Sequence, residues 1–320
     1  MPIELIPGPF DAPGNWYRGG LHIHTTESDG SIPPDRTVRQ YHMGGYDFIA
    51  LTDHNRVSVP SQCPPDFAVL RGCEFDVGET ELGNKYHIVG VGLEPGRDPQ
   101  PRMSPQATID AITAAGGYAF IAHPYWSGLS TRDLLGVTGY GAIEVYNAVC
   151  DVEIGRANSE VHLDDLLSRQ RIVNCVAVDD THWPVFDAIR AWVMVRASEL
   201  TPAAITASLR QGRFYASTGP LIYSVTTKDN AIEVECSPAA SITLVCDPTL
   251  GGKLTAGRAG PGIRARRLSG RQAQQSVGGT ESLTGASFPL SGRERYGRIR
   301  VEDAAGRCAW TNPLFVRTQS

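Results

Sequence analysis

The feature that most constrains this chain is a pair of histidines separated by one apolar residue, Leu21-His22-Ile23-His24. In an extended strand successive side chains point to opposite faces, so His22 and His24 lie on the same side. Two imidazoles side by side can hold a divalent cation, and the following Asp29-Gly30 turn can bring a carboxylate close to them. Histidine pairs are equally typical of polar surfaces or hydrogen-bonded cores, so the interpretation depends on the rest of the chain.

Length and composition limit the class of protein. A chain of 320 residues fits one large or two medium domains, and its 41% hydrophobic and 20% charged residues are typical of globular proteins. A formal net charge of −5 argues against a general nucleic-acid-binding surface. The first residues include neither a basic segment nor a long apolar run, so we expect a cytoplasmic protein without a membrane partner. The seven cysteines form no C-x-x-C pair, which argues against a zinc ribbon or a disulfide framework.

Strand and helix patterns alternate through the first two thirds of the chain. Short apolar runs predict strands, and each of several runs stops at a polar residue; Phe48-Ile49-Ala50-Leu51-Thr52, for example, ends in Asp53-His54. Proline or serine before amphipathic stretches and glycine after them predict helices, as at Pro33-Pro34 and Gly44-Gly45. Alternation of this kind predicts a parallel sheet, and polar residues at many strand ends favour a closed barrel over an open sheet.

The pattern changes after about residue 220. Alternating polar and apolar residues and turn signals predict strands near 222–226, 232–236, 241–246, 298–301 and 313–316, without a helical period between them. The sequence therefore predicts an α/β fold, a β/α barrel over 1–220 followed by a small all-β, sandwich-like domain over 221–320. Residues 251–285 are rich in Gly, Ser, Thr, Arg and Gln and predict a long loop.

Metal-binding side chains collect at the predicted strand ends, and six of the eight histidines are among them. These candidate ligands are His22, His24, Asp29, His54, Glu74, His87, His123, Asp180 and His182. Imidazole and carboxylate without thiolate suit Zn²⁺, Mn²⁺ or Fe²⁺. Nine ligands are too many for one ion, so we expect two or three divalent ions that share a carboxylate.

The order of these motifs resembles the PHP (polymerase and histidinol phosphatase) superfamily. The matching segments are His22-Ile23-His24, Ser28-Asp29-Gly30, Thr52-Asp53-His54, Gly72-Cys73-Glu74, His87-Ile88-Val89-Gly90, Ala122-His123-Pro124 and Asp180-Thr181-His182. The segment Gly212 to Pro220, followed by a β domain, further resembles the stand-alone metal-dependent phosphoesterase branch that is called CehA/McbA-like. That branch usually has Asp where this chain has Gly20, so a carboxylate that could orient an imidazole is missing.

The resemblance implies a distorted seven-stranded barrel with a trinuclear metal centre. Carried over by motif, one ion takes His22, His24, Glu74 and Asp180; a second shares Glu74 and takes His87 and His123; a third takes Asp29, His54 and His182. The implied catalyst is a metal-bridging hydroxide held by His22, His24, Glu74, His87, His123 and Asp180, which cleaves a small-molecule phosphoester.

Two other functions stay open. The same hydroxide attacks a carbonyl, so a carbamate, ester or amide hydrolase needs no other ligands; aromatic residues such as Trp126, Trp183 and Tyr125 around the pocket favour that alternative. A non-catalytic metal-binding or interaction protein is the other class. The sequence does not indicate an oligomeric state.

Several residues next to the motifs are candidates for substrate binding or for support of the ligands. Arginines near the motifs can bind an anion, and Glu144 is expected to hydrogen-bond a ligand histidine. These candidates are Arg18, Arg56, Tyr125, Glu144, Asn147 and Arg190. Asp53 and Asp179 are equally well interpreted as cap or turn carboxylates. A cluster of arginines (258, 264, 266, 267 and 271) falls in the predicted loop and is interpreted as a solvated segment, not a nucleic-acid site.

Overall fold

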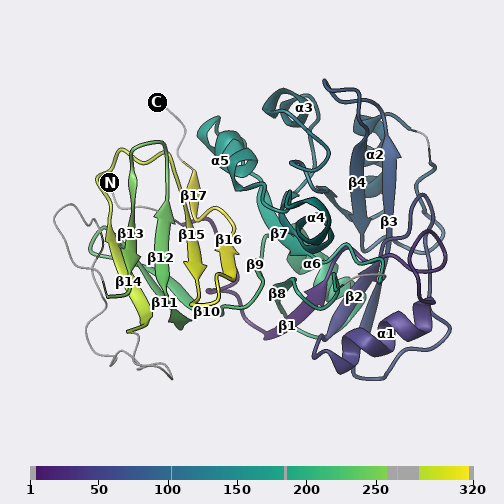
Figure 1. Ribbon diagram of the computed structural model, residues 1–320, viewed down its shortest axis with the longest axis horizontal. Coiled ribbons are helices and arrows are strands. Elements are labelled where there is room, and N and C mark those ends of the chain that lie inside the picture. The colour runs from purple at the N-terminus through teal and green to yellow at the C-terminus, as the bar shows by residue number, and fades with distance from the viewer. Residues whose placement is uncertain (1–4, 102, 184–185, 258–264, 266–280, 317–320) are drawn as a thin grey trace.

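The larger lobe of the computed structural model is built on a closed sheet (Figure 1). The structure describes residues 5–101, 103–183, 186–257, 265 and 281–316. The strands of this sheet, in spatial order, are β1 (Asn15–Gly20), β2 (Phe48–Leu51), β3 (Ala68–Val77), β4 (Tyr86–Val91), β5 (Tyr118–Ile121), β6 (Ala142–Asn147) and β7 (Asn174–Val178). The predicted α/β class is therefore confirmed.

The sheet closes where the segments after β1 and β7 meet. Ile23 and Thr181 form a parallel bridge. The amide of Asp180 donates to the carbonyl of His22 at 2.9 Å, and the amide of His24 donates to the carbonyl of Thr181 at 3.1 Å. This short seam joins β1 to β7, and it is made by the two segments, 22–24 and 180–181, that carry the predicted ligands His22, His24 and Asp180.

One strand runs against the others, which makes the barrel irregular. β1, β2 and β3 are parallel, as are β5, β6 and β7, but β4 is antiparallel to both of its neighbours. Within the described residues a loop joins β2 to β3 and a hairpin joins β3 to β4, so the expected strand–helix alternation is interrupted there. The start of β4 lies at the edge where the parallel strands end. A histidine at the beginning of this strand therefore reaches the same site as histidines that follow other strands.

Strand alternation divides the apolar residues between the barrel interior and the helices outside. Phe48 and Ala50 lie in the interior core, whereas Ile49 and Leu51 pack with Val38 and other residues of the helical layer. The helices are α1 (Pro34–Met43), α2 (Pro105–Ala114), α3 (Thr131–Leu135), α4 (Ala148–Ile154), α5 (Glu160–Ser168) and α6 (Pro202–Arg210). The short α3 and α4 were not predicted, because helices of one or two turns leave little periodicity to detect in the sequence.

Side chains at the N-cap positions explain where several helices begin. The Ser104 hydroxyl caps α2 by accepting a hydrogen bond from the amide of Ala107, and the Thr201 hydroxyl caps α6 through Ala204. The Asn147 side chain caps α4 through Cys150, directly after β6. Within the described ranges, no helix combines the length and apolar character needed to cross a lipid bilayer.

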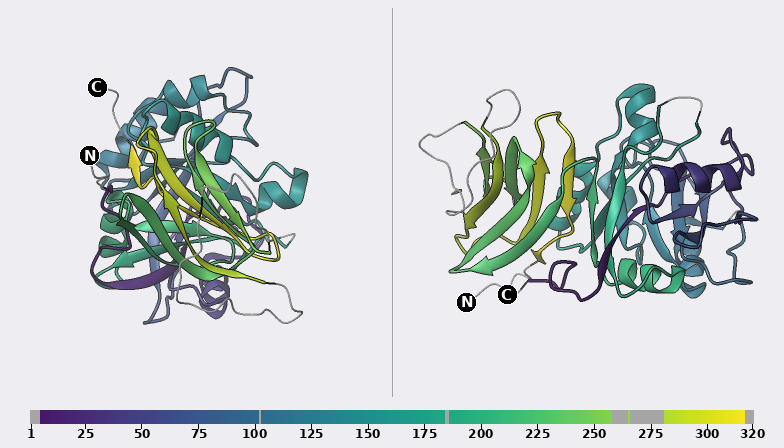
Figure 2. Two further views of the ribbon diagram at one scale, coloured as in Figure 1. Left: turned by 90° about the vertical axis from the view of Figure 1, so that its left-hand side faces the viewer. Right: turned by 90° about the horizontal axis from the view of Figure 1, so that it is seen from below.

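The second lobe is a β-sandwich that continues the barrel sheet (Figures 1 and 2). The sheet runs on from β1 through β8 (Trp192–Ala197), β9 (Phe214–Ser217), β16 (Cys308–Thr311), β15 (Tyr296–Glu302), β12 (Ser241–Val245) and β13 (Gly251–Thr255), and β17 (Phe315–Val316) pairs with β15. The facing sheet consists of β10 (Ile222–Lys228), β11 (Ala231–Ala239) and β14 (Leu283–Pro289). The predicted all-β character of this lobe is confirmed.

Two expectations for this part of the chain need correction. β8 and β9 were not predicted, because the long loop after Asp180 and the helix α6 separate their short apolar segments from the other predicted strands. The predicted loop over 251–285 is partly strand, since β13 opens it and β14 begins inside it. The five arginines at 258, 264, 266, 267 and 271 lie outside the described residues.

A buried arginine joins the two lobes. Arg298 on β15 has 1% of its side chain exposed, and its guanidinium donates to both carboxylate oxygens of Asp164 at 2.7 and 2.8 Å. It also donates to Glu160 at 2.9 Å, and Arg300 contacts the same carboxylate at 3.2 Å. Burial by itself raises the pKa of Glu160, but the charges of Arg298 and Arg300 outweigh it and lower that pKa. The pairing therefore fixes α5 against the sandwich.

We predict that Arg298→Met destabilises the protein by about 3 kcal/mol, because it leaves the partly buried carboxylates of Glu160 and Asp164 without their main cation. Urea unfolding followed by circular dichroism measures this loss. Arg307→Met is the matched control: Arg307 pairs with Asp303 but is 60% exposed, so its loss should be below about 1 kcal/mol. Equal effects of the two substitutions would contradict the inference.

Candidate metal centre

Side chains from every part of the barrel meet in one cavity at the end where the parallel strands stop. The cavity has a volume of about 390 Å³. Its lining includes seven of the nine predicted ligands: Asp29, His54, Glu74, His87, His123, Asp180 and His182. The other two, His22 and His24, are fully buried beneath it. All nine therefore lie together, although they are spread over more than half of the sequence.

The deepest group contains His22, His24, Glu74 and Asp180. The Nε2 atoms of His22 and His24 each lie 3.1 Å from Oε2 of Glu74. The same two nitrogens lie 3.2 and 3.1 Å from Oδ1 of Asp180. Two imidazole nitrogens and two carboxylate oxygens thus surround one point.

An unsatisfied oxygen indicates what this group can hold. Oδ1 of Asp180 is buried and accepts no hydrogen bond from a described residue, although two imidazoles face it. A buried carboxylate oxygen of this kind is costly unless a cation or a donor compensates it. Ligands about 2.1 Å from a Zn²⁺-sized ion are about 3.0–3.4 Å apart, which matches the separations of these donor atoms. The residues fit a divalent cation.

A second group shares Glu74 with the first. Oε1 of Glu74 lies 2.9 Å from Nδ1 of His87 and 3.4 Å from Nε2 of His123. The two oxygens of this carboxylate therefore face different histidines, although Oε2 also lies 3.4 Å from Nδ1 of His54. Glu74 is only 1% exposed, and its position on β3 places it between the two groups.

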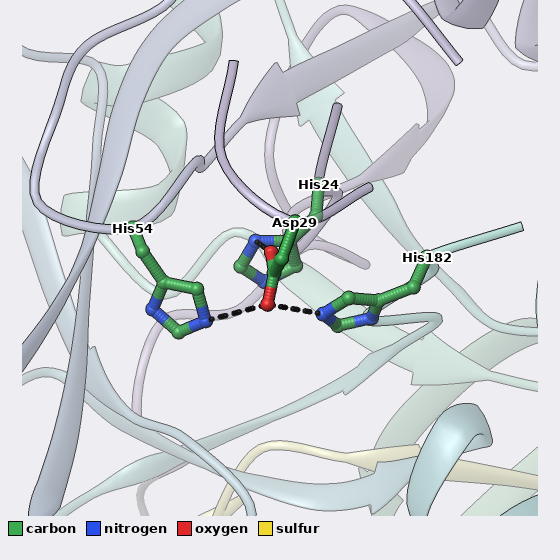
Figure 3. A group of neighbouring side chains, drawn as sticks. All are labelled: His24, Asp29, His54 and His182. Atoms are coloured by element: carbon green, nitrogen blue, oxygen red, sulfur yellow. Dashed lines mark ion pairs between the residues drawn. The ribbon is translucent and has the colours of Figure 1, made fainter. Parts of the chain in front are cut away.

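The third group, shown in Figure 3, contains more exposed side chains, with Asp29 52% and His54 25% exposed. Oδ2 of Asp29 lies 3.5 Å from Nε2 of His54 and 3.3 Å from Nε2 of His182. Oδ1 of Asp29 lies 3.3 Å from Nδ1 of His24, so this carboxylate also touches the deepest group. This third group therefore contains His24 as well as Asp29, His54 and His182, and a fourth group of possible ligands joins His54 to Asp76 and His87.

Glu144 and Asn147 hold the ligand side chains from β6. Oε1 of Glu144 lies 2.7 Å from Nδ1 of His22, the contact expected from the sequence, and Oε2 accepts from the amide of His123 at 2.7 Å. The amide group of Asn147 donates to Glu144 at 2.9 Å and to Oδ2 of Asp180 at 3.0 Å. Partners of this kind fix the orientation and the tautomer of a ligand histidine.

Other ligand histidines have partners that the sequence analysis missed. Oδ1 of Asp76 lies 2.8 Å from Nδ1 of His54, and the hydroxyl of Ser127 lies 2.9 Å from Nδ1 of His123. Asp76 follows Glu74 by two residues in β3, so strand alternation could have placed it on the face of the ligands. Ser127 offered no such signal, because it lies in a turn.

The carboxylates of Asp53 and Asp179 shape the loops around the site. Asp53 accepts from the amide and hydroxyl of Thr25 at 2.7 and 2.8 Å and from the hydroxyl of Ser28 at 2.7 Å. Asp179 accepts from the amides of residues 189–191 and from Tyr41 at 2.7 Å. These contacts are those of turn carboxylates, and burial raises the pKa of Asp179 to about 6.

The structure does not bring the candidate arginines into the cavity lining. Arg18 stacks on the rings of Tyr46 and Trp192, with its guanidinium carbon 4.2 and 3.6 Å from the two ring centroids. Arg56 pairs with Glu27 at 2.6 Å, and Arg190 donates to the carbonyl of residue 186 at 3.1 Å. These three side chains are engaged elsewhere, which is the physical reason that they do not reach the site.

Of the three aromatic residues considered for the pocket, one lies in the cavity lining and two do not. Trp126 lines the cavity, with its ring 4.9 Å from that of His123 and 6.0 Å from that of His87. Trp183 instead packs edge-on against Tyr41, and Tyr125 lies outside the lining, beneath the guanidinium of Arg156. Helix α4 supplies the rest of the wall through Val149, Cys150 and Glu153.

The site groups shift one another's pKa values. Burial by itself lowers the pKa of His24, but its close contacts with the carboxylates of Asp180 and Asp29 outweigh it and raise that pKa well above the usual value. The pKa of His182 is raised in the same way, chiefly by Asp29. Burial raises the pKa of Glu74, but the charges of the surrounding imidazoles lower it well below its usual range.

Comparison with solved structures identifies the fold. The whole chain resembles a two-domain protein from Bacteroides vulgatus that contains a predicted PHP-like metal-dependent phosphoesterase. The alignment covers 96% of this chain and 98% of that one, with a TM-score of 0.50 and 15% sequence identity. The chain has a PHP-like fold. The expected barrel followed by a β domain is thus confirmed by a neighbour of the same two-part architecture.

Sequence comparison agrees over shorter segments, and no protein-family model matches the chain. A phosphoribosyl 1,2-cyclic phosphate 1,2-diphosphodiesterase from Eggerthella lenta is 31% identical over 81 residues, which cover 24% of this chain and 31% of that protein. An uncharacterized protein from Methanocaldococcus jannaschii is 27% identical over 122 residues, 34% of this chain and 68% of that protein. The match to the diphosphodiesterase thus spans about a third of its length.

We predict that metal binding to the PHP-like site releases protons and strengthens as the pH rises. The raised pKa values keep His24 and His182 protonated above pH 6.5, and a cation must displace those protons. Titration calorimetry of Mn²⁺ or Zn²⁺ in two buffers of different ionisation enthalpy counts the protons released.

The same shifts set the pH dependence of the metal-free protein. A histidine with a raised pKa stabilises the fold below its unfolded value of about 6.5, and this contribution is lost as the pH rises through the folded pKa. The Tm of the metal-free protein should therefore fall above pH 6.5, and added metal should restore it. Unchanged Tm and no proton release would contradict both expectations.

We predict that Glu144→Gln lowers metal affinity about 10- to 100-fold, because the amide no longer fixes His22 and His123 as the carboxylate does. Metal content after dialysis against a metal buffer measures the change. Glu199→Gln, the same replacement on a surface loop after β8, is the control and should retain the metal. Equal metal content in the two variants would show that Glu144 has no role in positioning.

Proposed function

We propose that this protein is a metal-dependent hydrolase that cleaves a small-molecule phosphoester. The observation that carries the proposal is the convergence of nine imidazole and carboxylate side chains on one cavity, with Glu74 facing two groups of histidines. The PHP-like fold and the short match to a phosphodiesterase support the same reaction class.

The ligand sets follow from the three groups of side chains. One ion would be held by His22, His24, Glu74 and Asp180, a second by Glu74, His87 and His123, and a third by Asp29, His54 and His182. Zn²⁺, Mn²⁺ and Fe²⁺ suit these nitrogen and oxygen donors. When bound, such ions supply a nucleophile from water near neutral pH and neutralise charge that develops on a phosphoryl oxygen.

The protein's own residues prepare the donors for this task. Because Glu144 accepts a hydrogen from Nδ1 of His22, that imidazole keeps its proton there, and Nε2, beside Glu74 and Asp180, is the nitrogen that would give up its proton to bind a cation. The carbonyl of Asp180 does the same for His182, whose Nδ1 lies 2.8 Å away. Each ring is thus held in the tautomer that can bind a cation.

The backbone at the site adds to this preorganisation. His123 and Asp180 have φ angles of 27° and 55°, in the left-handed region that non-glycine residues rarely adopt. Strain of this kind persists where surrounding contacts hold it in place, and it is often found at functional sites. Here the amide of His123 is fixed by Glu144, and the amide of Asp180 is fixed by the carbonyl of His22.

A carbamate or ester hydrolase with the same ligands is the second candidate. Trp126 beside His123 and His87 gives the cavity an aromatic wall, which suits an aryl carbamate or aryl ester. Relative rates with nitrophenyl phosphates, nitrophenyl acetate and an aryl carbamate separate the two reactions.

We predict that protein loaded with Mn²⁺ or Zn²⁺ hydrolyses nitrophenyl phosphate esters and that Glu74→Gln lowers kcat/KM at least about a hundredfold, since it removes the carboxylate that both groups share. Released nitrophenolate and the metal content of each variant are the measurements. Glu199→Gln should match the wild-type protein. Less than one equivalent of metal, without rescue by added ions, would instead favour a non-catalytic protein.

A further inference from the structure

We infer that the cavity selects aryl phosphodiesters over phosphomonoesters. The carboxylate of Glu153 repels the second negative charge of a monoester, and Trp126 binds the aryl group of a diester. This inference rests on the proposed function and names its substrate class. A phosphodiester carries one negative charge, whereas a phosphomonoester carries between 1.5 and about 2 near neutral pH. The choice between them is therefore decided by the charges that line the cavity.

The first observation is that the described lining contains no lysine or arginine. The three candidate arginines, Arg18, Arg56 and Arg190, are occupied by aromatic rings, by Glu27 or by a backbone carbonyl. Arg71, directly before the motif Gly72-Cys73-Glu74, pairs with Asp98 at 2.7 Å. Sites that bind a phosphate dianion commonly do so through bidentate guanidinium contacts. This cavity offers only the cations that its ligands would hold, and their charge is partly cancelled by Asp29, Glu74 and Asp180.

The second observation is a carboxylate that belongs to none of the three ligand groups. Glu153 lines the cavity from α4 and makes no ion pair with a described residue. Asp151, on the same helix, is absent from the lining and lies 4.0 Å from Arg190. Glu153 is exposed, and a negative charge at this wall repels a doubly charged phosphoryl group more strongly than a singly charged one.

The third observation is the apolar part of the same wall. Trp126, Val149 and Cys150 all belong to the lining, and Trp126 is 38% exposed. An exposed indole beside the reacting centre gives an aromatic substituent a surface on which to stack. The wall therefore suits an ester with an aryl group and one charge.

The reaction balances with water alone. The water oxygen bonds to phosphorus, the bond from phosphorus to the aryl oxygen breaks, and the phenol leaves with one of the protons of water. The other product is a phosphomonoester, which carries the extra charge that Glu153 disfavours. One phenol should therefore be released for each diester, and inorganic phosphate should not accumulate. A separate phosphomonoesterase reaction is needed to consume the product.

The experiment compares kcat/KM for bis(p-nitrophenyl) phosphate and p-nitrophenyl phosphate at pH 8 with metal-loaded protein. We expect the wild-type protein to prefer the diester, and Glu153→Gln to lower the diester-to-monoester ratio about tenfold. Glu199→Gln removes the same charge at the opposite end of the barrel, where β8 pairs with the start of β1, and should leave the ratio unchanged.

A second pair of variants tests the aromatic wall independently of charge. Trp126→Ala should raise KM for bis(p-nitrophenyl) phosphate about fivefold more than KM for methyl p-nitrophenyl phosphate, and Trp126→Phe should restore most of the difference. Both substrates carry one charge, so the comparison isolates the contribution of the aryl group.

The outcomes separate this inference from the proposed function. Wild-type preference for the monoester, or an unchanged ratio in Glu153→Gln, overturns the inference but leaves a phosphoesterase. If Glu153→Gln loses both activities, and the loss is larger for substrates with poorer leaving groups, then this carboxyl protonates the leaving group. That result also overturns the charge selection. Hydrolysis of neither ester by metal-loaded wild-type protein overturns the proposed function itself.

Discussion

The architecture of the site depends on the compensation of buried negative charge. Glu74, Glu144 and Asp180 are each less than 5% exposed, and they lie within one network of imidazoles. Carboxylates in such surroundings need protons on the neighbouring histidines or cations between them. Without a cation, the imidazoles hold protons to an unusually high pH, which is the physical cause of their raised pKa values. Charge balance therefore couples the fold, the protonation state and the capacity for metal.

Much of the site could be predicted from the sequence because ligands follow strands. In parallel strands the carboxyl ends share one edge, so His54 and His123 could be assigned to the same site from the short apolar runs before them. His87 did not fit that pattern, since it stands at the beginning of its strand. The reversed direction of β4 explains it, and strand direction is set by tertiary pairing rather than by local sequence.

Other features were beyond a local interpretation of the sequence. Asp76 and Ser127 act on ligand histidines through contacts that only the folded chain creates. The arginines near the motifs were plausible anion ligands by sequence distance, but aromatic stacking and ion pairs turn them away. The buried pairing of Arg298 with α5 joins segments far apart in the chain, and nothing in the local pattern of β15 distinguishes it from an exposed strand arginine.

The seam between Ile23 and Thr181 has a consequence for how the protein is made. The two histidines at the start of the chain remain without Asp180 and His182 until roughly half of the polypeptide has followed them from the ribosome. Contacts between such distant segments form late and slow the folding of a domain. Barrel closure and completion of the metal site are thus one event, so a nascent chain that ends before Thr181 has neither. A cation that binds the completed site would stabilise the closed barrel.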